Sequence, residues 1–183
     1  MDKYTSIREL LSDRGIILEK GMTESELVEV EKCYGFTIPI TLKQFYSEML
    51  PVSQGFPNWR DNSEMNIKFI NDLVESPVKD ILYLIEQTEE DDEVLCQIRE
   101  DMRTNPKQFI DSIPKLTPIY GHRYMPAISG CCNPVLSIVD DDVIVYGRDL
   151  EDYFYNEFKP NMRTEGYELI QDILNIPFWS RFL

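Results

Sequence analysis

The chain has 183 residues, of which 18 are Lys or Arg and 33 are Asp or Glu, so its formal net charge is −15. This length supports one substantial hydrophobic core and predicts a single domain over residues 1–183. A strong negative charge repels nucleic-acid backbones and anionic lipids, so we expect neither nucleic acid nor a membrane as a partner. Basic protein surfaces are the partners that this charge attracts.

The sequence carries no signal for export or for membrane insertion. No stretch approaches the about 20 apolar residues of a spanning helix, and residues 1–5 lead into a charged helix with no signal peptide. We therefore expect a cytoplasmic protein. The cysteines Cys33, Cys96, Cys131 and Cys132 form no CxxC pair, which indicates reduced structural thiols.

Three helices are predicted in the first 50 residues. Thr23 and Glu26 have the spacing of a capping box, so a helix begins there, and Gly35 ends it. The helices before and after it are predicted from apolar residues at helical spacing. These residues are Tyr4, Ile7, Leu10 and Leu11 in the first helix and Leu42, Phe45, Tyr46 and Met49 in the third.

Residues 51–66 lack periodicity and predict a loop that contains Phe56, Trp59 and Arg60. Trp and Arg are the residue types that dominate binding hot spots, so this loop is a candidate for partner contact. In the alternative interpretation the loop folds back onto the core and Trp59 anchors it. The sequence leaves both interpretations open.

The middle of the chain, about residues 71–113, predicts an acidic helical segment. Two helices follow from apolar residues at helical spacing, and a third, short helix is predicted from Pro106 to Ile113. Residues 86–93 between the first two are mostly acidic and predict a solvated turn or a frayed helix end. The apolar residues are Val78, Ile81, Leu82 and Ile85, then Val94, Leu95, Ile98 and Met102.

The last third of the chain predicts a sheet followed by helices. A strand is expected at 116–120, and two β-branched runs at 135–139 and 143–147 predict a hairpin with a three-residue polar turn. Asp149 is placed to cap the next helix, and a final helix is expected around Tyr167, Ile170 and Leu174. This order predicts the α+β class, with one antiparallel or mixed sheet packed by helices.

The sequence offers no pattern for catalysis, a metal site or a cofactor site. His122 is the only histidine, which excludes sites built from several imidazoles, and it is more often a structural residue than a base. Glycine-rich phosphate loops are also missing. The run Asp140-Asp141-Asp142 is consistent with a cation ligand or with a polar turn, and the lack of surrounding oxygen ligands favours the turn.

Several short motifs, taken in order, carry a resemblance to a known family. Gly21-Met22-Thr23-Glu24 and Tyr34-Gly35-Phe36-Thr37-Ile38-Pro39, followed by a helix with Phe45, resemble the N-terminal signature of the SUKH superfamily, the proteins with SMI/KNR-like domains. Residues 56–61, 122–126, 133–137 and 146–158 are similar to one bacterial subgroup. The resemblance covers roughly residues 20–158.

This resemblance implies an α+β fold and a binding function without catalysis. Many bacterial members are immunity proteins that bind and neutralise toxins, often nucleases, and fungal relatives are regulatory scaffolds. The chain departs from the subgroup at about residues 71–113, where an acidic helical segment replaces an extended stretch with aromatic residues. A remodelled segment of this kind is where a binding protein changes its specificity.

We therefore predict a non-catalytic protein-binding domain, an immunity protein that neutralises a basic, nuclease-type toxin. The alternative is a regulatory scaffold that binds a peptide or a small ligand in a cleft. The acidic contact residues predicted are Glu89, Glu90, Asp91, Asp92, Glu93, Asp140, Asp141 and Asp142. The cleft residues predicted are Trp59, Arg60, His122, Arg123 and Asn133, for which a buried structural network is the competing explanation.

Overall fold

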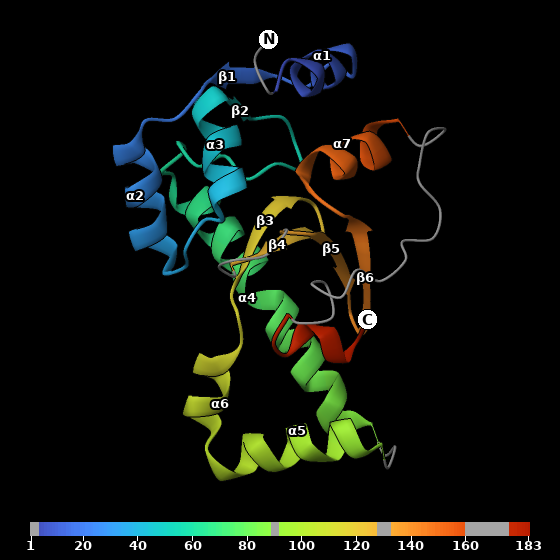
Figure 1. The fold of residues 1–183 in the computed structure, drawn as a ribbon. Helices are drawn as coiled ribbons and strands as arrows, with labels where there is room; N and C mark the ends of the chain where they lie inside the picture. The colour runs from blue at the N-terminus through green and yellow to red at the C-terminus, as the bar shows by residue number, and fades with distance from the viewer. Residues whose placement is uncertain (1–3, 89–91, 128–132, 160–175) are drawn as a thin grey trace.

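The computed structural model describes residues 4–88, 92–127, 133–159 and 176–183 (Figure 1). In this part of the chain, helices pack around a two-stranded and a four-stranded antiparallel sheet. The predicted α+β class is confirmed, and the sheets are purely antiparallel in the described residues. None of the described helices combines the length and apolar character needed to cross a bilayer.

The first three helices begin and end where local signals place them. In the capping box, the Thr23 side chain accepts from the Glu26 backbone N–H at 3.3 Å, and the Glu26 carboxylate accepts from the Thr23 N–H at 2.7 Å. Gly35 ends this helix with φ of +64°, a conformation that glycine adopts without strain. The bounds are α1 Thr5–Asp13, α2 Glu24–Tyr34 and α3 Ile40–Glu48.

A small two-stranded sheet was not foreseen. Strand β1, Leu18–Lys20, pairs antiparallel with β2, Met49–Pro51, which follows α3 directly. The prediction that Met49 belongs to the third helix is therefore wrong, because its spacing from Leu42 fits a buried position in a helix or in a strand. Gly21 permits the pairing, since a Cβ there would lie 1.8 Å from the backbone oxygen of Ser47.

The acidic middle segment folds as three helices, α4 Glu64–Gln87, α5 Glu93–Thr104 and α6 Pro106–Ser112. Helix α4 starts inside the predicted loop, because Ser63 caps it by accepting from the Asn66 N–H at 3.3 Å. We call residues 64–112 the helical segment. In Figure 1 the second half of α4, with α5 and α6, extends below the sheet.

The main sheet has the strand order β3-β4-β5-β6, and each strand pairs with the next in the chain. The β5–β6 hairpin is confirmed, but its turn has two residues, because Asp142 already pairs with Val139. Asp140 sits in the turn with φ of +54°, a conformation that Asp tolerates. The bounds are β3 Leu116–Tyr120, β4 Arg123–Pro126, β5 Val135–Val139 and β6 Asp142–Gly147.

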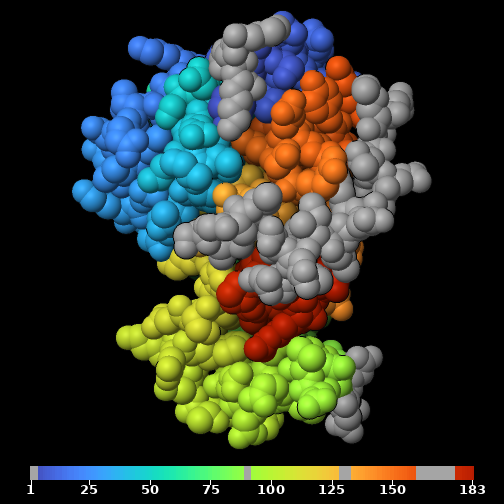
Figure 2. All heavy atoms as spheres, in the orientation of Figure 1, coloured from blue at the N-terminus to red at the C-terminus, as the bar shows by residue number. Residues whose placement is uncertain are grey.

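Helix α7, Leu150–Phe158, follows the sheet, and Asp149 caps it as predicted by accepting from the Asp152 N–H at 2.9 Å. The final helix predicted around Tyr167, Ile170 and Leu174 lies outside the described residues. Near the chain end, the 3₁₀ helix η3, Trp179–Arg181, packs above the helical segment (Figure 2).

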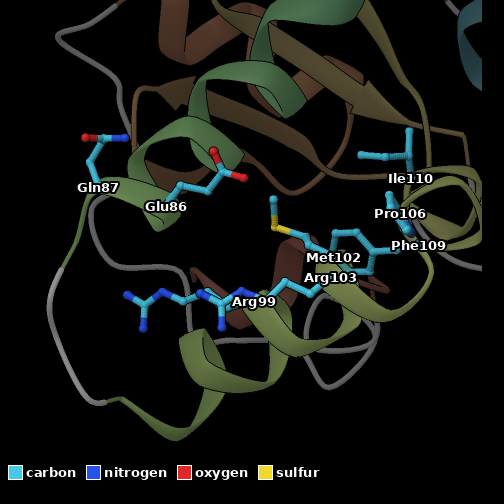
Figure 3. A pocket seen from close by; sticks show the side chains of 8 residues that line it. All are labelled: Glu86, Gln87, Arg99, Met102, Arg103, Pro106, Phe109 and Ile110. Atoms are coloured by element: carbon cyan, nitrogen blue, oxygen red, sulfur yellow. The ribbon is translucent and has the colours of Figure 1, made fainter.

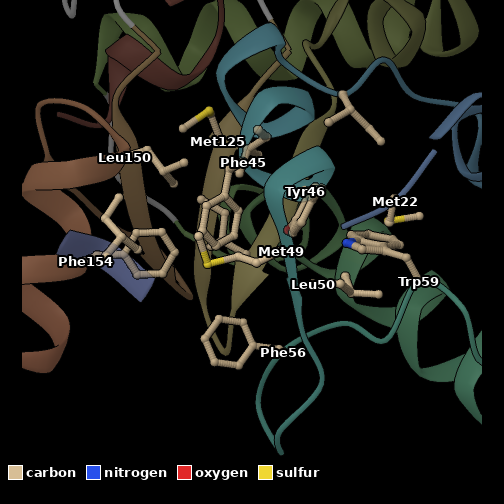
Figure 4. Packing of buried hydrophobic residues seen from close by; sticks show 14 of the residues in the cluster. Met22, Phe45, Tyr46, Met49, Leu50, Phe56, Trp59, Met125, Leu150 and Phe154 are labelled. Atoms are coloured by element: carbon tan, nitrogen blue, oxygen red, sulfur yellow. The ribbon is translucent and has the colours of Figure 1, made fainter. Parts of the chain in front are cut away.

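Both faces of the main sheet are buried, each in its own hydrophobic cluster. Met125 and Val135 point into a cluster with α1, α2, α3 and α7, part of which Figure 4 shows. Their neighbours Tyr124 and Leu136 point the other way, into a cluster with α4, α5 and the chain end. Trp179 closes this second cluster, and its indole N–H donates to the Pro114 carbonyl at 3.0 Å. The sheet is therefore the middle layer between two layers of helices.

The first cluster contains a tyrosine whose hydroxyl has no hydrogen-bond partner among the residues that the structure describes. Tyr153 is fully buried, and burial raises the pKa of its hydroxyl well above the ordinary tyrosine value. Because an unpaired buried hydroxyl destabilises the fold, Tyr153→Phe is expected to raise the free energy of unfolding by about 1 kcal/mol. Urea denaturation measures this change.

The control variant, Tyr153→Ala, removes the ring that packs on Phe154 at a centroid distance of 5.0 Å. It is expected to lower the free energy of unfolding by about 3 kcal/mol, because the ring leaves a cavity. A loss of stability in Tyr153→Phe comparable to that in Tyr153→Ala would show that the hydroxyl is paired.

Candidate functional site

Trp59 anchors its loop to the core. Its side chain is 5% exposed and packs edge-on against the rings of Tyr34, Phe36 and Tyr46 at centroid distances of 5.7 to 6.1 Å. Figure 4 shows its indole nitrogen turned toward the Tyr46 hydroxyl inside the core. Of the two interpretations that the sequence left open, the structure favours a loop folded back onto the core.

Arg60 ties this loop to the start of α2 and to β1. Its Nε donates to the Glu26 carboxylate at 2.7 Å, and Nη1 donates to the Glu19 carboxylate at 3.2 Å. The guanidinium also donates to the carbonyls of Lys20 at 2.7 Å and Gly21 at 2.9 Å. These four contacts tie the loop to residues 19–26, more than 30 positions earlier in the chain, so Arg60 has a structural role.

Glu26 shares its carboxylate between Arg60 and the helix cap. The hydrogen bond from Arg60, and then those from Thr23, lower the pKa of Glu26 from 4.5 to about 2. Trp59, Arg60 and Glu26 also line a small polar hollow of about 250 Å³ beside α2. The hollow is the part of this region that is open to a ligand.

Arg123 belongs to a second, separate network on β4. It is 8% exposed, and its Nε donates to Glu157 on α7 at 3.0 Å while Nη1 donates to Ser137 on β5 at 2.9 Å. The guanidinium lies 3.8 Å from the ring centroid of Tyr146. This network joins α7 to the sheet, and Arg123 is held inside it with its donors directed at the protein.

His122 and Asn133 lie apart from each other. His122 is exposed in the β3–β4 turn. The pKa of its imidazole is lowered, mainly because the ring is partly desolvated and also because the positive charge of Arg123 lies nearby. Asn133 is buried before β5, and its side-chain oxygen has no partner among the described residues. Arg123 pairs with Ser137 in the middle of β5, whereas Asn133 lies two residues before the start of that strand.

The five residues predicted to share one cleft therefore occupy three places in the fold. Trp59 and Arg60 lie beside α2, His122 and Arg123 at the β3–β4 turn, and Asn133 at the far end of β5. Their residue types suggested a polar cleft. In the structure, however, the two arginines are bonded to residues from distant parts of the sequence.

The acidic run before α5 is described only in part. Asp92 is the N-cap of α5 and accepts from two backbone N–H groups in the first turn at 2.9 and 3.1 Å. Glu93 is exposed next to it. The predicted contact residues Glu89, Glu90 and Asp91 lie outside the described part of the chain. Asp92 thus combines a structural role with a position on the surface.

The second acidic run lies at the tip of the β5–β6 hairpin. Asp140, Asp141 and Asp142 are all exposed there, and the neighbouring Val139 and Ile144 are partly exposed as well. Three carboxylates at an exposed tip are free to meet a basic surface. Within the described residues, no group of three or more His, Cys, Asp or Glu side chains is placed to hold a metal ion.

An apolar groove along α4 was not foreseen from the sequence. It has a volume of about 440 Å³, and Val74, Val78 and Leu82 form its wall on α4. Ile110 and Ile113 form the opposite wall. The signal was present, because Val74, Val78 and Leu82 recur every four residues, but this spacing also fits a buried face. The position of α6 in the structure is what shows that this row of apolar side chains on α4 remains partly open to solvent.

A second hollow, of about 580 Å³, lies between the end of α4, α5 and α6 (Figure 3). Its lining combines apolar and charged side chains, whereas the groove is mainly apolar. The residues that line it are Glu86, Gln87, Arg99, Met102, Arg103, Pro106, Phe109 and Ile110.

A scan of protein-family models, a search of the curated proteins and a search of the solved structures each find no match to this chain. The resemblance to the SUKH superfamily thus rests on the sequence motifs, and it enters below as part of a proposal.

The Glu26–Arg60 pair predicts an acid-dependent loss of stability. Because the pKa of Glu26 is about 2 in the folded chain and near 4.5 otherwise, the unfolded chain binds more protons between these values. The stabilisation by Glu26 is therefore complete above about pH 4.5 and is lost as the pH falls toward 2. Glu26→Gln is expected to lower the free energy of unfolding at pH 7 and to flatten its decline over this range.

The measurement is a series of urea denaturations from pH 7 to pH 2 on both proteins. Glu29→Gln, an exposed carboxylate on the same helix, is the matched control and should follow the parent chain. Parallel curves for Glu26→Gln and the parent chain would argue against the pair as a source of stability.

Proposed function

We propose that this chain is a non-catalytic protein-binding domain and that its helical segment, residues 64–112, meets the partner. The observation that carries the proposal is the apolar groove along α4, which is open at the surface and lined by Val74, Val78 and Ile110. Apolar pockets of this kind receive the large side chains that dominate binding energy in protein interfaces.

Exposed apolar side chains are most numerous in the same helical segment, and one of them, Ile110, lines the groove. Nine large hydrophobic residues are exposed in the described part of the chain, and five of them lie in the helical segment. Concentration of exposed apolar surface in one region is typical of interaction sites, whereas scattered single residues are ordinary. The five residues are Met65, Phe69, Tyr83, Val94 and Ile110.

Charge indicates what kind of partner fits. The net charge of −15 gives the whole surface a negative potential, and exposed acids occur on the helical segment at Asp72, Asp80 and Glu86 and on the hairpin tip. Such a field speeds the approach of a basic partner. With the resemblance to SUKH immunity proteins, this supports a basic, nuclease-type toxin domain as the partner.

The regulatory-scaffold alternative has one observation in its favour. The hollow between α4, α5 and α6 has the volume of a small-molecule site. A toxin gene next to this gene favours the immunity function, and its absence favours the scaffold.

Where a toxin gene lies next to this gene, its toxin domain is the partner used to test the groove. Val78→Gln is expected to weaken binding at least tenfold, because an amide buried against apolar side chains loses its hydration without gaining a partner. Calorimetry measures the affinity, and inhibition of the toxin's activity by equimolar protein measures neutralisation. Ile17→Gln is the matched control, since Ile17 is 63% exposed and lies in another part of the fold.

Two results would contradict the proposal. If the neighbouring toxin domain does not bind, or if Val78→Gln and Ile17→Gln bind it as tightly as the parent chain, the groove is not the partner site.

The hairpin tip is tested through association rates. Joint replacement of Asp140, Asp141 and Asp142 by Asn is expected to slow association a few-fold at low salt and to leave dissociation unchanged. Asn tolerates the left-handed conformation at position 140. Stopped-flow measurements at low and high salt distinguish the two rates.

The matched control neutralises three exposed acids elsewhere, Glu9, Asp13 and Glu29. If both triple variants slow association equally, only the net charge acts, and the hairpin tip is not a contact site.

A further inference from the structure

The hollow between α4, α5 and α6 has the size of a small-molecule site. Its volume of about 580 Å³ falls within the roughly 300–1,000 Å³ typical of ligand pockets. Three helices wall it, and its lining residues belong to no part of the Arg60 and Arg123 networks. The inference drawn from it does not rest on the proposed function.

One side of the hollow is apolar and supported from behind. Met102, Pro106, Phe109 and Ile110 form this side. The ring of Phe109 packs edge-on against Phe178 at a centroid distance of 6.1 Å. Phe178 in turn packs on the buried Trp179, so the apolar side is backed by the second hydrophobic cluster.

The other side carries two arginines one helical turn apart on α5, Arg99 and Arg103. Figure 3 shows their guanidinium groups on the same side of the hollow, next to the end of α4. Arg99 is held there, because it donates from Nε to the Ile85 carbonyl at 3.0 Å and from Nη2 to the Thr88 carbonyl. Arg103 makes no ion pair with any carboxylate in the described part of the chain.

The two arginines place two positive charges beside each other in the lining of the hollow. Like charges four residues apart on a helix repel each other, and this chain has 33 acidic residues available for pairing. The lining nevertheless holds two arginines and one carboxylate, Glu86, so it carries a net charge of +1 inside a chain of −15. A locally cationic hollow with an apolar side matches a ligand that has one anionic group and an apolar body.

We propose that this hollow binds a small organic anion of that class, an acyl or aromatic carboxylate or sulfonate. Its anionic group receives charge-assisted hydrogen bonds from Arg103, with Arg99 adding positive potential beside it. Its apolar body lies on Met102 and Phe109. Glu86 and the negative field of the chain disfavour ligands with several negative charges, such as nucleotides.

The test uses two probes on the full chain, anilinonaphthalene sulfonate and octanoate. The sulfonate is expected to bind with one site per chain and enhanced fluorescence, and octanoate is expected to displace it. Arg103→Gln should weaken both by about tenfold or more, because a charge-assisted hydrogen bond is lost. Lys107→Gln is the matched control, since it removes the same charge from an exposed residue that does not line the hollow.

A second variant tests the apolar side. Met102→Glu places a negative charge in the hollow and should abolish binding of both probes. Circular dichroism confirms that each variant is folded. Neutral phenylnaphthylamine, which has the same apolar body, should bind weakly and respond little to Arg103→Gln.

Several outcomes would overturn the proposal. These are equal weakening by Arg103→Gln and Lys107→Gln, several sulfonates bound per chain, failure of octanoate to displace the sulfonate, or equal affinity for the neutral probe. Binding of an acidic peptide without binding of octanoate would also overturn it, because the site would then serve a protein partner.

Discussion

The main sheet must be covered on both faces, and the rest of the fold follows from this requirement. Adjacent residues such as Tyr124 and Met125 are both buried but enter opposite hydrophobic clusters. The N-terminal helices and α7 cover one face, while α4, α5 and the chain end cover the other. Helix α4 has 24 residues and is longer than the sheet is wide, so part of its surface extends beyond the area it covers.

Two ion-pair networks hold the layers in place, and both use arginines that the sequence marked as candidate binding residues. Arg60 joins its loop to β1 and α2, and Arg123 joins β4 to α7. Arg123 is buried, so its ion pair with Glu157 is costly to disturb, because loss of either partner leaves an unpaired charge. These residues explain stability, so the binding surface has to be sought where polar and apolar groups remain open.

Local signals predicted the parts of the fold that depend on few residues. The capping box at Thr23, the cap at Asp149 and the β5–β6 hairpin each need contacts within a few positions, and each is confirmed. The β1–β2 sheet and the groove depend on residues about 30 positions apart, which no local pattern specifies. For the same reason, the partners of Arg60 and Arg123 could not be read from their residue type.

One short helix of the helical segment, α6, borders both the apolar groove and the mixed hollow. Ile110 on α6 lines both the apolar groove and the mixed hollow, so the position of this short helix shapes both. Helix α6 has seven residues, none of which is buried, and it contacts α5. Few packing contacts oppose small shifts of such a helix, in contrast to the sheet strands buried on both faces. The apolar groove and the mixed hollow thus both border a helix that has no buried residue, and neither is lined by Arg60 or Arg123.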